Sequence, residues 1–414
     1  MSQVSFDSIR DYASLNAKNI SGKKLLLIIP DKTRSGGKYI GQVIRGIYDS
    51  VASRVDEFTI LIALGTHGPM KEDAIYSYLG FSEAEIKTSF PKINFVNHEW
   101  NVPSKLRTIG TLTREDMLRL SNNCFDLKIV RREEGIPVEV NYRVTEADDI
   151  VIIGPSLPHE VVGCSGGNKY FFPGCSGSDI TGCTHWLGAS VTIPDIIGKV
   201  RTPVRDVIDH LASMINKPKK HCFALVVSGD TLYDCYYGTP ESAYEQAAKR
   251  TLEVNAKYVT RKYKKVLALC SKKYAEIWTG GKCSYKLQGV VEEGGDLIIY
   301  APHLTQVSES WGAQIEQVGY HALPYIEAHF EEYLDKKIGL GVLAHVTHVK
   351  GVGKYQNGVE TPKINVIMAS ALSKEKCAEI NLGYLDHSTL NIEDYRNDPD
   401  CLVVDDAGEV LYLV

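Results

Sequence analysis

The stretch from Leu157 to Trp186 concentrates residue types that can do chemistry. Its thirty residues include six glycines and three cysteines, together with His159, Lys169 and His185. A neutral histidine can act as general acid or base, and a lysine amine can form a covalent bond. Because glycine and proline disfavour a regular helix, we expect a polar loop here. The alternative is a long surface loop with stray histidines.

Two familiar motifs occur in weak form. Residues 163–167 match the string G-x-S-x-G around Ser165, but a nucleophile elbow also needs a strand directly before the serine and a helix directly after it. Residues 338–344, IGLGVLA, contain G-x-G-x-x-A, which we interpret as a strand without the following helix or acidic residue of a dinucleotide site. Neither pattern therefore favours a serine hydrolase or an NAD enzyme.

A zinc site is also disfavoured, because the spacing of the candidate ligands matches no common zinc module. These candidates are Cys164, Cys175, Cys183 and His185. The ten cysteines of the chain are scattered, and the N-terminus lacks the apolar core of a signal peptide. We therefore expect reduced thiols and a cytoplasmic protein.

Strands and helices alternate along the first part of the chain, which predicts a parallel sheet covered by helices. The predicted strands end near Pro30, Leu64 and Gly154, and each is followed by a polar loop. Because the carboxyl ends of parallel strands meet at one edge of a sheet, Arg34, His67, His159 and the central loop should converge there.

The chain of 414 residues is long enough for two α/β domains with mainly parallel, helix-covered sheets and a cleft between them. We expect a first domain at 1–260, a second at 261–390, and a C-terminal segment at 391–414 that returns to the first domain. The last fifteen residues resemble a hairpin around Ala407 and Gly408.

Composition excludes two classes of partner. A net charge of −5 provides no basic surface for nucleic acid, and no apolar run is long enough to span a bilayer. Small molecules remain as the expected ligands, and a homo-oligomer stays open.

Four segments together resemble the nickel-pincer lactate racemase family. Residues 31–35, DKTRS, are similar to the family's D-x-T-R-P, with Ser35 in place of proline, and residues 63–70, ALGTHGPM, to its A-L-G-T-H-R/K-P-M, with Gly68 departing. The central stretch is similar to P-H-x-x-x-G-x-S-G-G-x-K-x-x-x-P-G with a histidine sixteen residues after the lysine, and residues 202–205, TPVR, resemble N-P-V-R.

The resemblance implies a racemase or epimerase of a 2-hydroxy acid that uses a nickel-pincer nucleotide, a pyridinium mononucleotide carrying a thioamide and a thiocarboxylate. By match, Lys169 would bind this cofactor covalently, His185 would ligate nickel, and His67 and His159 would be the two acid–bases. Hydride transfer from C2 to the cofactor would avoid a dianion. Cofactor-binding residues would further include Asp31, Thr33, Arg34, Ser165, Gly166 and Gly167.

The second domain departs from the family at its expected substrate residues. The family's Y-Q-x-x-K aligns with residues 278–282, so that Lys282 matches the lysine while Trp278 and Thr279 replace tyrosine and glutamine. We therefore expect a substrate larger or more polar than lactate, such as a sugar acid or a dicarboxylate, bound by these three residues.

Two other functions stay open. The same cofactor could serve another redox or elimination reaction on a hydroxy acid, or the chain could be a cofactor-free ligand-binding homologue. The resemblance also implies partner proteins that make and load the cofactor, so the chain produced without them would lack it.

Overall fold

The structure, a computed structural model, describes residues 4–414, which form two compact units built from interleaved chain segments. The division follows no single boundary along the chain, unlike the expected ranges 1–260 and 261–390. The first unit comprises the chain up to Leu157, Cys164–Thr184 and Pro203–Val254, and the second comprises Pro158–Gly163, His185–Thr202 and Asn255–Val414.

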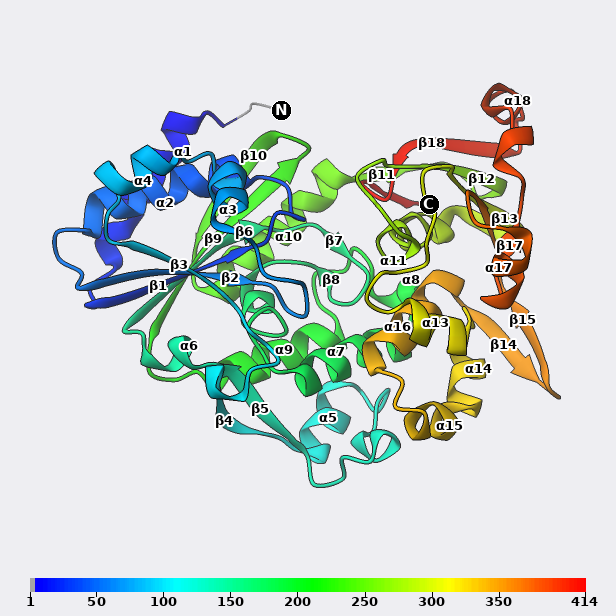
Figure 1. The fold of residues 1–414 in the computed structure, drawn as a ribbon, viewed down its shortest axis with the longest axis horizontal. Coiled ribbons are helices and arrows are strands. Elements are labelled where there is room, and N and C mark those ends of the chain that lie inside the picture. Colours follow the sequence, from blue (N-terminus) through cyan, green and yellow to red (C-terminus); the bar gives the residue numbers. More distant parts are fainter. Residues whose placement is uncertain (1–3) are drawn as a thin grey trace. The chain divides into compact units, whose positions relative to one another are not determined.

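The first unit is built on a six-stranded sheet with the order β10-β9-β6-β1-β2-β3 (Figure 1). Its strands are parallel except for β10, which pairs antiparallel with β9. Because β1 lies between β6 and β2, the polar loops after these three strands leave the same edge, as predicted. The strands are β1 (Lys24–Pro30), β2 (Glu57–Ala63), β3 (Ile93–Asn97), β6 (Asp149–Pro155), β9 (Lys219–Ser228) and β10 (Thr231–Gly238).

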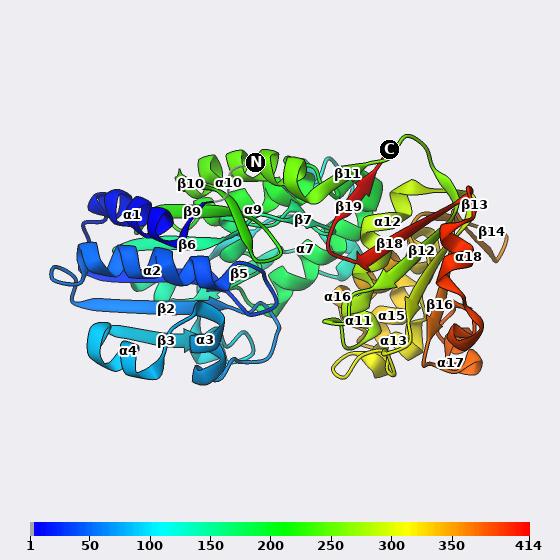
Figure 2. The ribbon, with the colours of Figure 1, turned by 90° about the horizontal axis from the view of Figure 1, so that it is seen from above.

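Helices α1 (Phe6–Asn16) and α2 (Gly37–Val51) cover one face of this sheet. Alternate residues of β1, among them Leu25 and Leu27, pack with Ile44 and Ile47 of α2 in one buried cluster. This is the pattern of a strand that is buried on both faces, because all of its other residues except Lys24 are buried too. Figure 2 looks onto this face, with α1 and α2 in front of the strands.

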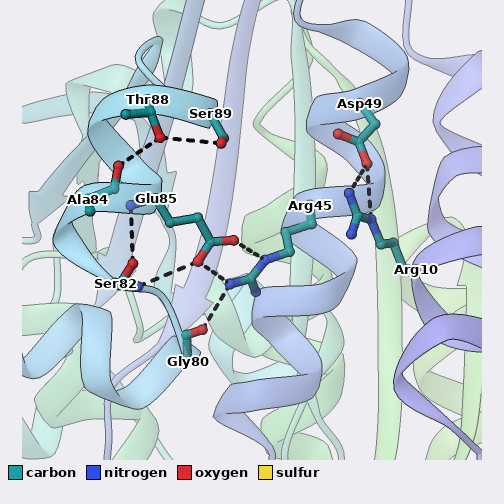
Figure 3. Close-up of polar contacts among 9 residues, drawn as sticks. All are labelled: Arg10, Arg45, Asp49, Gly80, Ser82, Ala84, Glu85, Thr88 and Ser89. Carbon is teal, nitrogen blue, oxygen red and sulfur yellow. Dashed lines mark hydrogen bonds and ion pairs between the residues drawn. The ribbon is translucent and has the colours of Figure 1, made fainter.

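A buried arginine ties α2 to the next two helices. Arg45 donates to Glu85 Oε1 at 2.8 Å and to the carbonyl of Gly80 at 2.8 Å, and its guanidinium lies 3.9 Å from the centroid of the Phe81 ring (Figure 3). The capping box of Ser82 and Glu85 starts α4 (Glu83–Ser89), directly after α3 (Glu72–Leu79). The ion pair therefore anchors the start of α4 to the sheet-covering helix.

The rest of the first unit surrounds the sheet. The strands within residues 93–144 are β3, which is parallel in the main sheet, and an antiparallel pair, β4 and β5. The remaining elements are β4 (Leu106–Leu112), α5 (Arg114–Leu120), β5 (Ile136–Asn141), α6 (Tyr142–Glu146), α9 (Pro203–Ser213) and α10 (Pro240–Asn255). Helix α9 begins at Pro203, within the segment TPVR.

The second unit has a parallel five-stranded sheet with the order β17-β16-β13-β12-β18. Its strands are β12 (Tyr263–Cys270), β13 (Val291–Ala301), β16 (Asn365–Ser370), β17 (Gly383–Tyr384) and β18 (Cys401–Ala407). Its helices are α8 (Ile193–Ile196), α11 (Ile277–Gly280), α12 (Lys282–Leu287), α13 (Gly312–Val318), α14 (Leu323–Ala328), α15 (Phe330–Asp335), α16 (Leu340–Lys350), α17 (Lys374–Glu379) and α18 (Ile392–Arg396).

The C-terminal prediction was wrong. The last residues form no hairpin, because β18 pairs parallel with β12 and β19 (Leu411–Leu413) pairs parallel with β11 (Ala256–Tyr258). Residues 391–414 also belong to the second unit and do not return to the first. The glycine at 408 marks the change of partner between two strands, which by sequence alone looks like a turn.

Two segments predicted as other structures are helices. IGLGVLA begins α16, nine of whose eleven residues are buried. A helix that is buried on all sides has apolar residues all around it, so its sequence lacks the regular spacing of polar residues that marks an exposed helix. Such a sequence resembles that of a buried strand. The central stretch likewise contains α7 (Ser178–Val191), which carries His185. Gly188 lets this helix pack closely against Val161, because an added Cβ would lie only 3.1 Å from the Val161 side chain.

Among residues 4–414, none of the helices is both long enough and apolar enough to cross a membrane.

Candidate active site

A histidine–carboxylate pair stands at the edge where β1 and β2 end. His67 Nδ1 lies 2.5 Å from Asp31 Oδ2, and the Asp31 side chain is 8% exposed whereas that of His67 is 50% exposed. Thr33 donates to the other carboxylate oxygen through its backbone N–H at 2.9 Å and its hydroxyl at 2.5 Å. Parallel strands therefore bring together two residues that lie 36 positions apart.

The Asp31 carboxylate is ionised. Burial works to raise its pKa, but the hydrogen bond of His67, the charge that this ring carries when it is protonated, the hydroxyl of Thr33 and the charge of Arg34 together hold the pKa well below the usual range. An ionised carboxylate only accepts hydrogen bonds, so His67 Nδ1 carries the proton and its Nε2 presents a lone pair. The charge of Arg34 thus acts on Asp31, three positions before it in the chain.

Hydrogen bonds to backbone groups hold the part of the central stretch that belongs to the first unit. Ser165 donates its backbone N–H to Leu157 O at 2.8 Å and accepts the Leu157 N–H on its hydroxyl at 3.0 Å. Arg205 of α9 donates to the carbonyls of Cys164 and Gly166 at 2.7 and 3.1 Å. Ser165 is therefore a structural hydroxyl, which agrees with the argument against a nucleophile elbow.

Gly166 and Gly167 have φ values of +102° and +57°, which L side chains rarely adopt. A Cβ on Gly167 would come within 2.8 Å of the Cβ of Tyr244, so the glycine also permits close packing. Lys169 follows in a short 3₁₀ helix, Gly167–Tyr170, and its side chain is partly exposed. The two glycines shape the turn that presents this lysine.

His159 belongs to the second unit, and it is 7% exposed. Its Nδ1 accepts the backbone N–H of Val161 at 3.1 Å, which leaves the proton of the neutral ring on Nε2. Glu160 Oε2 lies 3.5 Å from the same Nδ1. His67 and His159 therefore adopt opposite tautomers, and each has a carboxylate beside Nδ1.

Glu160, whose side chain is 20% exposed, is a charged centre within the second unit. Burial works to raise its pKa, but the positive charge of His159 when that ring is protonated, the hydrogen bond of the residue's own backbone N–H and the charge of Lys282 hold the pKa well below the usual range. The predicted substrate residue Lys282 thus lies near Glu160, and its Nζ is 5.0 Å from the centroid of the Tyr274 ring.

Two buried histidines of α16 complete this group. His345 contacts the Tyr285 hydroxyl through Nδ1 at 2.7 Å and the Tyr320 hydroxyl through Nε2 at 3.2 Å, and its ring lies 4.2 Å from that of Trp278. Burial lowers the pKa of His345 to about 3 and that of His348 to about 4, so both rings are neutral.

Sequence reasoning found His159 and Lys282 but missed Glu160, His345 and His348. The spacing of the two α16 histidines, three positions apart, would have indicated one helix face had the segment been recognised as a helix. Thr279 hydrogen-bonds the Glu276 carbonyl at 3.1 Å, which ends a helical turn.

His185 lies in α7 within the second unit and is partly exposed. Its charge acts on His348, which places the two imidazoles near each other. Within residues 4–414, no group of three or more His, Cys, Asp or Glu side chains could hold a metal ion. Burial raises the pKa of the Cys164 and Cys183 thiols to about 12.

Comparisons with known proteins agree on the family. The model of the lactate racemase N-terminal domain matches residues 5–131 and 126–191. The chain is 30% identical to a protein from Thermotoga maritima of known crystal structure, with a TM-score of 0.86 over 99% of this chain and 98% of that one.

The fold is also that of the lactate racemase apoprotein from Thermoanaerobacterium thermosaccharolyticum, with 18% identity and a TM-score of 0.72 over 100% of this chain and 94% of that one. A search of curated proteins found no match. The chain therefore belongs to the lactate racemase-like family, and this membership indicates an isomerase of the racemase or epimerase type.

Proposed function

We propose that this protein racemises or epimerises a 2-hydroxy acid other than lactate, using a nickel-pincer nucleotide. The observation that carries the proposal is the pair of histidines held in opposite tautomers, His67 by Asp31 and His159 by the Val161 N–H. A reaction that inverts one carbon needs a proton acceptor for one enantiomer and a proton donor for the other.

The residues present fit the cofactor by their chemistry. The proposed donors are the Lys169 amine for covalent attachment and the His185 imidazole as the single protein ligand of nickel, so a cluster of protein ligands is not required. The loop after β1 leads into α2, a fifteen-residue helix whose N-terminus has no side-chain cap and no acidic residue in its first turn. Such a terminus suits a phosphate.

When bound, the cofactor supplies the acceptor and donor for the C2 hydride. The protein's own part is proton transfer and positioning. His67 Nε2 takes the hydroxyl proton of one enantiomer, and the buried Asp31 carboxylate stabilises the resulting imidazolium. His159 acts as the acid in its protonated form, whose positive charge the neighbouring Glu160 carboxylate stabilises: it gives its Nε2 proton to the substrate oxygen and becomes neutral. The roles of the two histidines reverse for the other enantiomer. We assign the substrate carboxylate to Lys282, and the positions beside it to Trp278 and Thr279.

The test uses protein produced together with the cofactor-synthesis and loading proteins, and a panel of chiral 2-hydroxy acids deuterated at C2. We expect loss of optical purity with deuterium retained at C2 of the product, and at least a 100-fold slower reaction in His67→Ala. Release of a 2-oxo acid would instead indicate a redox reaction, and binding without turnover would indicate a ligand-binding protein; either result contradicts the proposal.

A further inference from the structure

We propose that Asn97, the last residue of β3, is a positioning residue for His67. Its side chain holds the loop between β2 and α3, residues 64–71, so that the His67 ring stays against the Asp31 carboxylate. The inference rests on the proposed function, because the position of His67 matters only if this ring exchanges protons with a substrate. It is carried by two hydrogen bonds between the Asn97 side chain and the backbone of the loop.

The start of this loop is fastened to the central stretch through backbone groups. The Gly65 N–H donates to Gly174 O at 2.9 Å, and the Gly174 N–H in turn donates to Lys169 O at 3.1 Å. The His67 N–H donates to Leu64 O at 3.0 Å, which closes a turn. Gly65 has a φ of +57°, in the left-handed region that favours glycine. These bonds place the start of the loop against the turn that carries Lys169.

The end of the loop is held by the Asn97 amide. The Met70 N–H donates to Asn97 Oδ1 at 3.0 Å, and Asn97 Nδ2 donates to Met70 O at 2.9 Å. Because a carboxamide carries an acceptor and a donor side by side, it can bind both backbone groups of one residue. The Met70 side chain is 8% exposed and packs in the buried cluster of β1 and α2. The amide therefore fixes the backbone three positions after His67.

Between these two anchors, residues 67–69 are exposed. An added Cβ on Gly68 would have no heavy atom of residues 4–414 within 4 Å apart from its chain neighbours. Because glycine restricts the backbone least, the loop can turn at this position once its Met70 end is released. Such motion would draw His67 Nδ1 away from Asp31 Oδ2, now 2.5 Å from it. The tautomer that leaves Nε2 basic would then no longer be held.

The end of β3 gives Asn97 a rigid base. This strand lies beside β2 and parallel to it, with Asn97 opposite Ile62 (Figure 2). The next residue, His98, donates its backbone N–H to Ile62 O at 3.1 Å, and its Nε2 lies 3.0 Å from Ser176 O. A side chain carried by such a strand is placed more precisely than one carried by a loop. Since the bonds of His98 do not involve the Asn97 side chain, Asn97→Ala should fold and release only Met70.

The experiment compares Asn97→Ala, which removes both hydrogen bonds, with Asn97→Asp, which keeps the acceptor and removes the donor. Asn365→Ala is the matched control, because the exposed Asn365 of β16 also makes two side-chain hydrogen bonds, to Gly294 O at 3.3 Å and to Asp296 Oδ1 at 2.9 Å. Nitrogen-15 NMR reports the tautomer of the neutral His67 ring in the full chain without the cofactor. Steady-state kinetics report kcat and KM of the loaded enzyme.

We expect both Asn97 variants to lose the uniform Nδ1–H tautomer of His67 and to lower kcat about 10-fold or more with little change in KM, while Asn365→Ala alters neither. Because Asn97 acts through the contact of His67 with Asp31, Asn97→Ala combined with Asp31→Asn should lose less than the product of the two single losses. An unchanged tautomer in both Asn97 variants, a change in KM without one in kcat, or losses that multiply fully would overturn the inference.

The inference and the proposed function can fail separately. A loaded wild type that inverts no 2-hydroxy acid, together with a His67 tautomer that depends on Asn97, would end the proposed function and support the inference. Inversion that proceeds equally well in wild type and in Asn97→Ala would do the reverse.

Discussion

At the scale of single residues, the site depends on hydrogen bonds that set which nitrogen of each imidazole carries a proton. Asp31 is buried and ionised beneath His67, and its second oxygen is occupied by Thr33. This holds the ring in the tautomer that leaves Nε2 basic. The His159 ring is held in the opposite tautomer by a backbone N–H, which a side-chain substitution at position 161 would not remove.

Asp31→Asn should lower kcat about 100-fold, with a smaller change in KM, because the amide no longer stabilises a protonated His67. Steady-state kinetics of the loaded enzyme measure this. Asp49→Asn is the control: Asp49 pairs with Arg10 at the surface, both side chains 42% exposed, and its loss should leave kcat unchanged. Equal effects of the two substitutions would contradict a role for Asp31 in proton transfer.

The Asp31–His67 pair should also make the free energy of unfolding depend on pH. Because the folded-state pKa of Asp31 lies below its unfolded value, its contribution is fully present above about pH 5 and is lost as the pH falls through the folded pKa. The difference in unfolding free energy between wild type and Asp31→Asn should therefore be constant near neutrality and shrink in acid.

The pairing of His67 with Asp31 in the first unit could be predicted, whereas the grouping of Glu160, Lys282 and His348 in the second could not. His67 and Asp31 follow neighbouring strands, so the parallel order of β1 and β2 brings them together. In the sequence, Lys282 lies more than a hundred positions after Glu160, and His348 lies more than sixty positions after Lys282. No local pattern marks which polar residues of a buried helix will face one another.

At the scale of elements, loops after parallel strands were predictable because buried strands have continuous apolar runs. The prediction of secondary structure from the sequence failed where a helix is buried on all sides, as in α16. The same prediction failed where a helix contains glycines that close packing requires, as in α7. It also failed where a glycine separates two strands that pair with different partners, as Gly408 does. In each case tertiary contacts override the local preference.

The ion pair that joins α2 to α4 should be worth far more than its surface counterpart. Arg45→Ala should destabilise the protein by about 3 kcal/mol, because it leaves a partly buried Glu85 and a carbonyl unpaired. Arg10→Ala, which removes the exposed pair visible in the same view, should cost less than about 1 kcal/mol (Figure 3). Chemical denaturation measures both, and similar losses would contradict the assigned role of burial.

At the scale of the whole molecule, the chain passes between its two compact units several times, within the very stretch that carries the proposed cofactor residues. Lys169 belongs to the first unit, and His159 and His185 belong to the second. Sequence ranges could not predict this, because a division by contacts need not follow the order of the chain.

The central claim is that Lys169 carries a nickel-containing cofactor, and intact-mass spectrometry tests it most directly. Protein produced with the cofactor-synthesis and loading proteins should show a covalent adduct with nickel, and Lys169→Ala should show neither, whereas Lys199→Ala, at an exposed lysine paired with Asp195, should keep both. An unmodified, nickel-free wild-type chain under those conditions, or an adduct that persists in Lys169→Ala, would contradict the account.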